Sequence, residues 1–168
     1  MSEPKIHIVC GSTGAGKTTY SMKLENALPA VRFSIDEWMM ELFWPDASPE
    51  TTFDWAYERV ERCGRMMRSV AIPVLRNGSS VIFDTAFSTR NERHDFYAWA
   101  RAKNLEVHLH FLDVSQETRW SRVEKRNSER DATFAFQVTR GMFDGDEKRW
   151  QPPCKDELSE VPHTLISA

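Results

Sequence analysis

The residues best suited to chemistry form one continuous run, GSTGAGKT, which begins at Gly11 and ends at Thr18. It matches the pattern GxxxxGK[S/T], in which glycines let the main chain approach a phosphate and backbone N–H groups bind its oxygens. Lys17 can then reach the outer phosphates of a nucleotide, and the Thr18 hydroxyl can bind Mg²⁺. A glycine-rich turn with a solvated lysine is the plain alternative. The complete pattern predicts ATP or GTP binding by Gly11, Ser12, Thr13, Gly14, Ala15, Gly16, Lys17, Thr18 and Thr19.

A carboxylate ends the apolar run 80–84, SVIFD. In proteins with such a glycine loop, an acidic residue at the end of a strand commonly helps to hold the magnesium ion. We therefore predict that Asp84 and Thr18 bind Mg²⁺. The alternative is that Asp84 caps its own turn with Thr85, because an aspartate after a strand is a common turn residue.

A second carboxylate, Asp36, follows the β-rich run 31–34. At that place it should face the same end of a sheet as the glycine loop, where it could act as a general base toward an acceptor hydroxyl. Ser34 and Glu37 also have the spacing of a helix capping box, which would put Asp36 in the first turn of a helix. The two interpretations are compatible.

Four arginines recur at positions 119, 122, 126 and 130, a spacing that places them on one face of a continuous helix. Like charges on one face repel, and Glu129 is the only acid placed three or four positions from one of them, where it could lie on the same face. A bound polyphosphate would neutralise them. The alternatives are a solvated basic face and a helix that ends before Arg130. We predict that Arg122 and Arg126 contact the nucleotide and contribute to catalysis.

Arg90 and Arg93 follow Asp84 closely and could reach the acceptor or the γ-phosphate, although they could equally begin a helix that faces solvent. The candidate acceptor contacts are therefore Asp36, Thr85 and Arg90. Three histidines lie within β-rich runs, and we interpret them as packed or edge residues, not as metal ligands; they are His7, His108 and His110.

Short β-rich runs alternate with helical patterns along the chain. The β-rich runs cover 5–10, 31–34, 80–84 and 106–113, and the helical patterns cover 17–28, a few residues from 36, 52–76, 89–103 and a stretch from 115. This alternation predicts an α/β fold with a parallel sheet, helices on both faces, and a ligand beyond the carboxyl ends of the strands. All of the candidate residues above lie at those ends or on the helices that follow.

The chain has 168 residues, the size of one domain, and we expect a single domain over 1–168 with a lid at about 115–135 and a tail at about 145–168. Its formal net charge of −3 gives no general attraction for nucleic acid. Three cysteines far apart indicate neither a disulfide framework nor a structural metal. No run approaches the roughly 20 apolar residues that a membrane helix needs. We expect a soluble, cytoplasmic protein with no membrane partner.

The motifs together resemble the small P-loop kinases, and the likeness spans about residues 5–130. It rests on GSTGAGKT, on SIDE at 34–37, on VIFDTAFSTRNER at 81–93 and on FLDVSQETRWSRVEKRN at 111–127. More narrowly, the chain is similar to the group of chloramphenicol phosphotransferases, zeta toxins, polynucleotide kinase domains and related bacterial AAA-type ATP-binding proteins.

The resemblance implies a three-layer P-loop NTPase fold with a parallel sheet of about five strands and an arginine-bearing lid. It also implies ATP as donor, Asp36 as base, and Arg122 and Arg126 closing over the phosphates with adenine near Arg122. Polynucleotide kinases carry a basic residue after the aspartate, where this chain has Trp38-Met39-Met40, so a nucleic-acid acceptor is not expected.

These observations predict a P-loop kinase that moves the γ-phosphoryl group of Mg-ATP to a hydroxyl of a small molecule. Two alternatives stay open, a nucleotide-dependent ATPase or switch that acts through a partner and a kinase for the 5'-hydroxyl of a nucleic acid.

Overall fold

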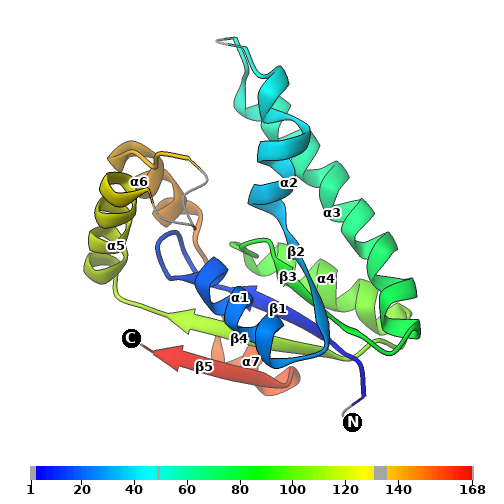
Figure 1. Ribbon diagram of the computed structural model, residues 1–168. Helices are drawn as coiled ribbons and strands as arrows, with labels where there is room; N and C mark the ends of the chain where they lie inside the picture. The colour runs from blue at the N-terminus through cyan, green and yellow to red at the C-terminus, as the bar shows by residue number, and fades with distance from the viewer. Residues whose placement is uncertain (1–2, 49, 131–135, 168) are drawn as a thin grey trace.

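A computed structural model describes residues 3–48, 50–130 and 136–167, and within them one five-stranded sheet forms the centre of the molecule (Figure 1). The strand order is β2-β3-β1-β4-β5, and every neighbouring pair is parallel. The predicted α/β fold with a parallel sheet is confirmed. The strands are β1 (Ile6–Cys10), β2 (Ala30–Ser34), β3 (Ser80–Asp84), β4 (Val107–Asp113) and β5 (His163–Ser167).

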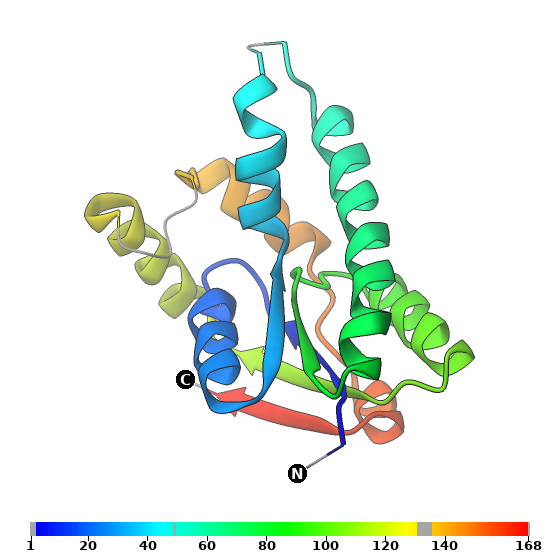
Figure 2. The same cartoon turned by 45° about the vertical axis from the view of Figure 1, so that its right-hand side comes forward.

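Helices connect the strands, because parallel neighbours need a crossover that brings the chain back to the other end of the sheet. They are α1 (Lys17–Ala27), α2 (Ile35–Leu42), the short 3-10 turn η1 (Trp44–Asp46), α3 (Phe53–Arg76), α4 (Arg90–Ala102), α5 (Gln116–Glu129), α6 (Arg140–Arg149) and α7 (Lys155–Glu160). Figure 2 shows α2 and α3 projecting together beyond the sheet, with α5 and α6 as a second pair across from them.

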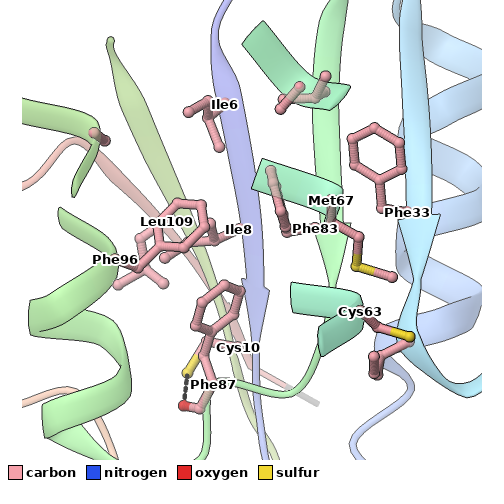
Figure 3. Packing of buried hydrophobic residues seen from close by; sticks show 14 of the residues in the cluster. Ile6, Ile8, Cys10, Phe33, Cys63, Met67, Phe83, Phe87, Phe96 and Leu109 are labelled. Carbon is pink, nitrogen blue, oxygen red and sulfur yellow. Dashed lines mark hydrogen bonds between the residues drawn. The ribbon is translucent and has the colours of Figure 1, made fainter. Parts of the chain in front are cut away.

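The two faces of the sheet pack against different helices, because alternate residues of each strand point to opposite sides. On one face, Ile6 and Ile8 pack with Phe83, with Met67 of α3 and with Phe96 of α4 in the larger core (Figure 3). On the other face, a smaller core is contacted by residues of α1; its buried members are Val9, Ala15, Ile82, Leu112 and Val114. A third cluster joins α5 to α6.

Two of the local helix signals in the sequence are confirmed in full and a third in part. Thr89 and Glu92 form a reciprocal capping box at the start of α4, and Gly78 follows α3 with a left-handed φ of +86°. At α2, the Ser34 hydroxyl accepts from the Glu37 N–H, but the Glu37 carboxylate bonds to Arg32. The capping box predicted there is therefore only half formed.

The C-terminal part contains more regular structure than a tail. Helix α6 begins at Arg140, and β5 adds the fifth strand beside β4, paired from Leu109 with His163 onward. No periodic pattern in the sequence predicts β5, because most of its residues are exposed at the sheet edge. The predicted lid corresponds to α5 and the chain after it, of which residues 131–135 lie outside the described residues.

Candidate functional site

The loop between β1 and α1 has a conformation that only glycine adopts easily. Gly14 and Gly16 have φ of +81° and +94°, and a Cβ at Gly14 would lie 2.5 Å from the carbonyl oxygen of Arg119. Gly16 is the N-cap of α1 and provides no side-chain cap, so the first N–H groups of the helix are left for another acceptor. A helix N-terminus of this kind favours an anion.

The amine of Lys17 lies within this loop and donates a hydrogen bond to the Ser12 carbonyl oxygen at 3.2 Å. Burial lowers the pKa of Lys17, while the carboxylates of Asp36 and Asp84 act in the opposite direction. The lysine therefore stands beside both acids that the sequence singled out. A cation among carboxylates at a helix N-terminus is an arrangement that can bind and orient phosphate oxygens.

Asp84 is buried at the end of β3, beside Thr18 of the loop. Burial raises the pKa of Asp84, and Lys17, Arg32 and a hydrogen bond from Thr18 lower it. Arg32 donates to the Asp84 carboxylate at 3.3 Å. The hydroxyl and the carboxylate are oxygen ligands of the type that Mg²⁺ prefers. Among residues 3–48, 50–130 and 136–167, no group of three acidic, histidine or cysteine side chains could hold a metal, so other ligands would have to come from nucleotide and water.

Asp36 lies in the first turn of α2 and is exposed toward a cavity that borders the loop. The protein around the carboxylate raises its pKa by desolvation, and the charges of Lys17 and Arg126 lower it. The Asp36 carboxylate therefore faces two of the cations that were predicted to bind phosphate. An acid in such surroundings could accept a proton from a hydroxyl held beside it.

Two arginines of α5 face the same loop. Arg122 donates to the Ala15 carbonyl oxygen at 3.1 Å, and Arg126 interacts electrostatically with Asp36. The Nε atom of Arg126 is buried and has no hydrogen-bond partner among the described residues. Because a buried polar group without a partner is costly, this atom is suited to a ligand that brings an acceptor oxygen.

Arg119 is not available to bind a nucleotide. The expectation from the spacing, that all four arginines form one uncompensated face, is therefore wrong for this residue. Its guanidinium forms two hydrogen bonds with the Glu147 carboxylate, at 2.6 and 2.7 Å, and a third with the Thr13 carbonyl oxygen at 3.3 Å. Glu147 also accepts from the Ser12 hydroxyl at 2.5 Å. Arg119 is therefore neutralised by an acid of α6 and holds the phosphate loop. Arg130 is the C-cap of α5, past the end of the helix.

Residues of α6 were missed by sequence reasoning. Glu147 and Asp146 contact the two hydroxyl side chains of the loop, since the Thr13 hydroxyl donates to Asp146 at 2.7 Å. The acids lie more than 130 positions from the loop. No spacing rule connects such distant residues; the only available signal was two adjacent acids in a helical stretch.

The arginines after Asp84 also lie apart from the loop. Arg93 is fully buried and forms a two-point ion pair with Glu157 of α7 at 2.6 and 2.9 Å. It neither faces solvent nor lines the cavity at the phosphate loop, so both interpretations drawn from the sequence are wrong for this residue. Arg90 lines a separate cavity of about 340 Å³ beside α4 and α7. Thr85 is half-buried and lies outside the described lining of the cavity at the phosphate loop.

The cavity at the phosphate loop has a volume of about 800 Å³, within the range that holds small-molecule ligands. It brings together residues from the loop, the strand ends, α2, α3, α5 and α6. Those that carry charge are Lys17, Asp36, Asp84, Arg122, Lys125, Arg126, Glu129, Asp146 and Arg149.

Comparison with known proteins agrees with this geometry. The family model described as an AAA domain, AAA_33, matches residues 6–153. The chain belongs to this family. With its phosphate loop and parallel sheet, it is a P-loop kinase-like protein whose site is of the nucleotide-binding type. No protein with a curated description matches the AAA-domain chain.

Solved structures of low identity share the fold. Kti12 of Chaetomium thermophilum, in complex with ADP-AlF3, is 15% identical with a TM-score of 0.68, over 96% of this chain and 88% of that protein. A gluconokinase from Sinorhizobium meliloti is 12% identical with a TM-score of 0.60, over 99% and 84%. A fungal RNA kinase is 18% identical with a TM-score of 0.61, over 99% of this chain but 38% of that protein. Among the described residues of the AAA-domain protein, no helix has the length and hydrophobicity to span a membrane.

Proposed function

We propose that this P-loop kinase-like protein transfers the γ-phosphoryl group of ATP to a hydroxyl of a small molecule, with Mg²⁺. The observation that carries the proposal is the position of Asp36. Its carboxylate faces the cavity at the phosphate loop and interacts with both Lys17 and Arg126. A protein that only binds nucleotide has no need of an acid at this place, whereas transfer to a hydroxyl needs a group that orients it and takes its proton.

The cationic side chains of the site and Mg²⁺ would stabilise the negative charge of the phosphate oxygens. Lys17, Arg122 and Arg126 would stabilise the oxygens of the transferred group, and such preorganised donors account for much of the catalysis in phosphoryl transfer. The acceptor oxygen forms its bond to phosphorus as the bond to the ADP oxygen breaks, and the hydroxyl proton passes to Asp36. Thr18 and Asp84 would hold Mg²⁺, which when bound neutralises charge on the phosphate oxygens.

The experiment is a screen with γ-labelled ATP against nucleosides, sugars, antibiotics and oligonucleotides, followed by Asp36→Asn with the best acceptor. We expect labelled product, and a loss of about 10²–10⁴-fold in kcat for Asp36→Asn, the range for a general base. Calorimetry should show ATP binding unchanged. Glu41→Gln, an exposed acid of the same helix, is the matched control and should keep full activity.

A second candidate, a nucleotide-dependent ATPase or switch, is favoured by the likeness to Kti12, whose structure holds ADP-AlF3. This hypothesis predicts ATP hydrolysis without any labelled acceptor, and little effect of Asp36→Asn on the rate of hydrolysis.

Labelling of oligonucleotides alone would instead favour the hypothesis of a nucleic-acid kinase, which the likeness to a fungal RNA kinase supports. Either result would contradict the small-molecule proposal.

A further inference from the structure

One arginine of the cavity at the phosphate loop is not explained by phosphate binding. Arg149 is the last residue of α6 and lines the cavity. Among the described residues its guanidinium has no ion pair and no hydrogen bond, and it lies 5.6 Å from the ring centroid of Phe53. Two other arginines of the region have carboxylate partners, Arg119 in Glu147 and Arg140 in Asp144. Arg149 is therefore a cation available for an anion in the cavity.

The contact with Phe53 fixes where this cation stands. Phe53 begins α3 and lines the cavity, with 67% of its surface exposed. Its ring stacks on Tyr57, with centroids 6.2 Å apart. Its contact with Arg149 joins the end of α6 to the start of α3. An arginine above an aromatic ring keeps its N–H groups at the edge free to bind an anion.

This cation is separate from those at the phosphate loop. Arg122 and Arg126 come from α5, and Arg122 contacts the loop itself. Arg149 comes from α6 and contacts α3, which follows the helix that carries Asp36. The cavity thus has several cationic side chains beside the phosphate loop and a separate one, Arg149, beside α3. Asp36 lines the same cavity.

We propose that the acceptor carries an anionic group, a phosphate or a carboxylate, and that Arg149 binds this group while the acceptor hydroxyl faces Asp36. Phe53 contributes the apolar surface against which the guanidinium and the body of the acceptor lie. This inference rests on the proposed function, because it assigns an acceptor to the same cavity. It narrows the substrate class to anionic alcohols.

The test uses matched probes that differ in one anionic group. They are ribose 5-phosphate with ribose, and 4-(hydroxymethyl)benzoate with benzyl alcohol, so that one pair tests phosphate and the other carboxylate. Calorimetry in the presence of Mg-ADP measures binding, and γ-labelled ATP measures transfer. The variants are Arg149→Met, Arg149→Lys and Lys148→Met. Lys148→Met is the matched control, because it removes one positive charge from an exposed neighbour on the same helix.

We expect at least one anionic probe to bind at least tenfold more tightly than its neutral partner, a difference typical of one charged hydrogen-bonded contact. Arg149→Met should abolish this preference, Arg149→Lys should retain part of it, and Lys148→Met should leave it unchanged. The inference is overturned if no anionic probe binds, if the neutral partners bind equally well, or if Arg149→Met keeps the preference.

The two proposals can fail separately. Binding that depends on Arg149 without any labelled product would leave the anion site in place and remove the phosphotransferase proposal. Labelled product that Arg149→Met does not alter would support the phosphotransferase and remove the role of Arg149.

Discussion

Gly14 has the least tolerance for a side chain in the phosphate loop. Its φ is +81°, and an added Cβ would meet the Arg119 carbonyl oxygen at 2.5 Å, a backbone atom that cannot move independently of α5. A left-handed conformation alone costs an L-residue about 1–2 kcal/mol. We predict that Gly14→Ala lowers the free energy of unfolding by about 2 kcal/mol and weakens nucleotide binding at least tenfold. Urea unfolding and calorimetry measure the two effects.

The comparison residue for this prediction is Gly64, within α3. No heavy atom lies within 4 Å of a Cβ built there, and its φ is not left-handed. Alanine should therefore raise the free energy of unfolding by about 0.5–1 kcal/mol through helix propensity. A Gly14→Ala protein that is as stable as Gly64→Ala, with unchanged nucleotide affinity, would show that the loop does not depend on a bare backbone at position 14.

At the scale of elements, the Glu147 carboxylate of α6 contacts both the phosphate loop and α5. Glu147 bonds to Arg119 and Ser12, and the Arg119 side chain is 6% exposed. The Arg119 hydrogen bonds lower the pKa of Glu147, so the carboxylate is charged in the folded protein. Removing one member of a buried ion pair leaves the other charge without compensation, at a cost of about 3–5 kcal/mol.

Glu147→Ala should therefore lower the free energy of unfolding by about 3 kcal/mol, measured by urea unfolding at pH 7. Asp144→Ala on the same helix breaks an exposed pair with Arg140 and should cost less than about 1 kcal/mol. Equal effects of the two substitutions would mean that the contact between α6 and the loop contributes no more than a surface pair.

The same elements show how far the sequence could predict the structure. The phosphate loop, the strands β1 to β4 and the capped start of α4 follow from signals within a few residues of one another, and all were predicted. The partners of Arg93 and Arg119 lie 64 and 28 positions away, on helices that only tertiary packing brings near. Charge repulsion along α5 was a sound local inference, but the compensating acid came from α6.

The edge strand β5 was missed for a related reason. An edge strand with most of its side chains exposed has no apolar alternation, so its pairing with β4 is decided by the backbone and not by a sequence pattern. The candidate site was predicted in outline, because the carboxyl ends of parallel strands must meet. The contribution of α6 to the site, through Asp146 and Arg149, could not be predicted, because nothing in the local sequence indicates that a helix will face a distant loop.

At the scale of the whole molecule, a buried histidine pair links the centre of the sheet to α1. His7 of β1 and His110 of β4 are joined by a hydrogen bond of 2.9 Å between Nδ1 and Nε2, and the Tyr20 hydroxyl is 2.8 Å from Nδ1 of His110. These contacts use the neutral imidazoles, consistent with the expectation that the histidines are packed residues. Burial lowers the pKa of His7 to about 4 and that of His110 to about 3.

This difference from the ordinary histidine pKa of about 6.5 makes folding depend on pH. Between about pH 6.5 and pH 4 the unfolded chain binds protons that the folded chain does not, so the free energy of unfolding falls as pH falls. Each histidine contributes a slope of up to about 1.4 kcal/mol per pH unit.

We predict that urea unfolding from pH 7.5 to pH 5 shows this loss of stability, and that His110→Gln makes the slope shallower. His94→Gln, at an exposed position of α4, should leave the slope unchanged. A wild-type protein equally stable at both ends of this range would mean that the pair takes up protons without opening the sheet.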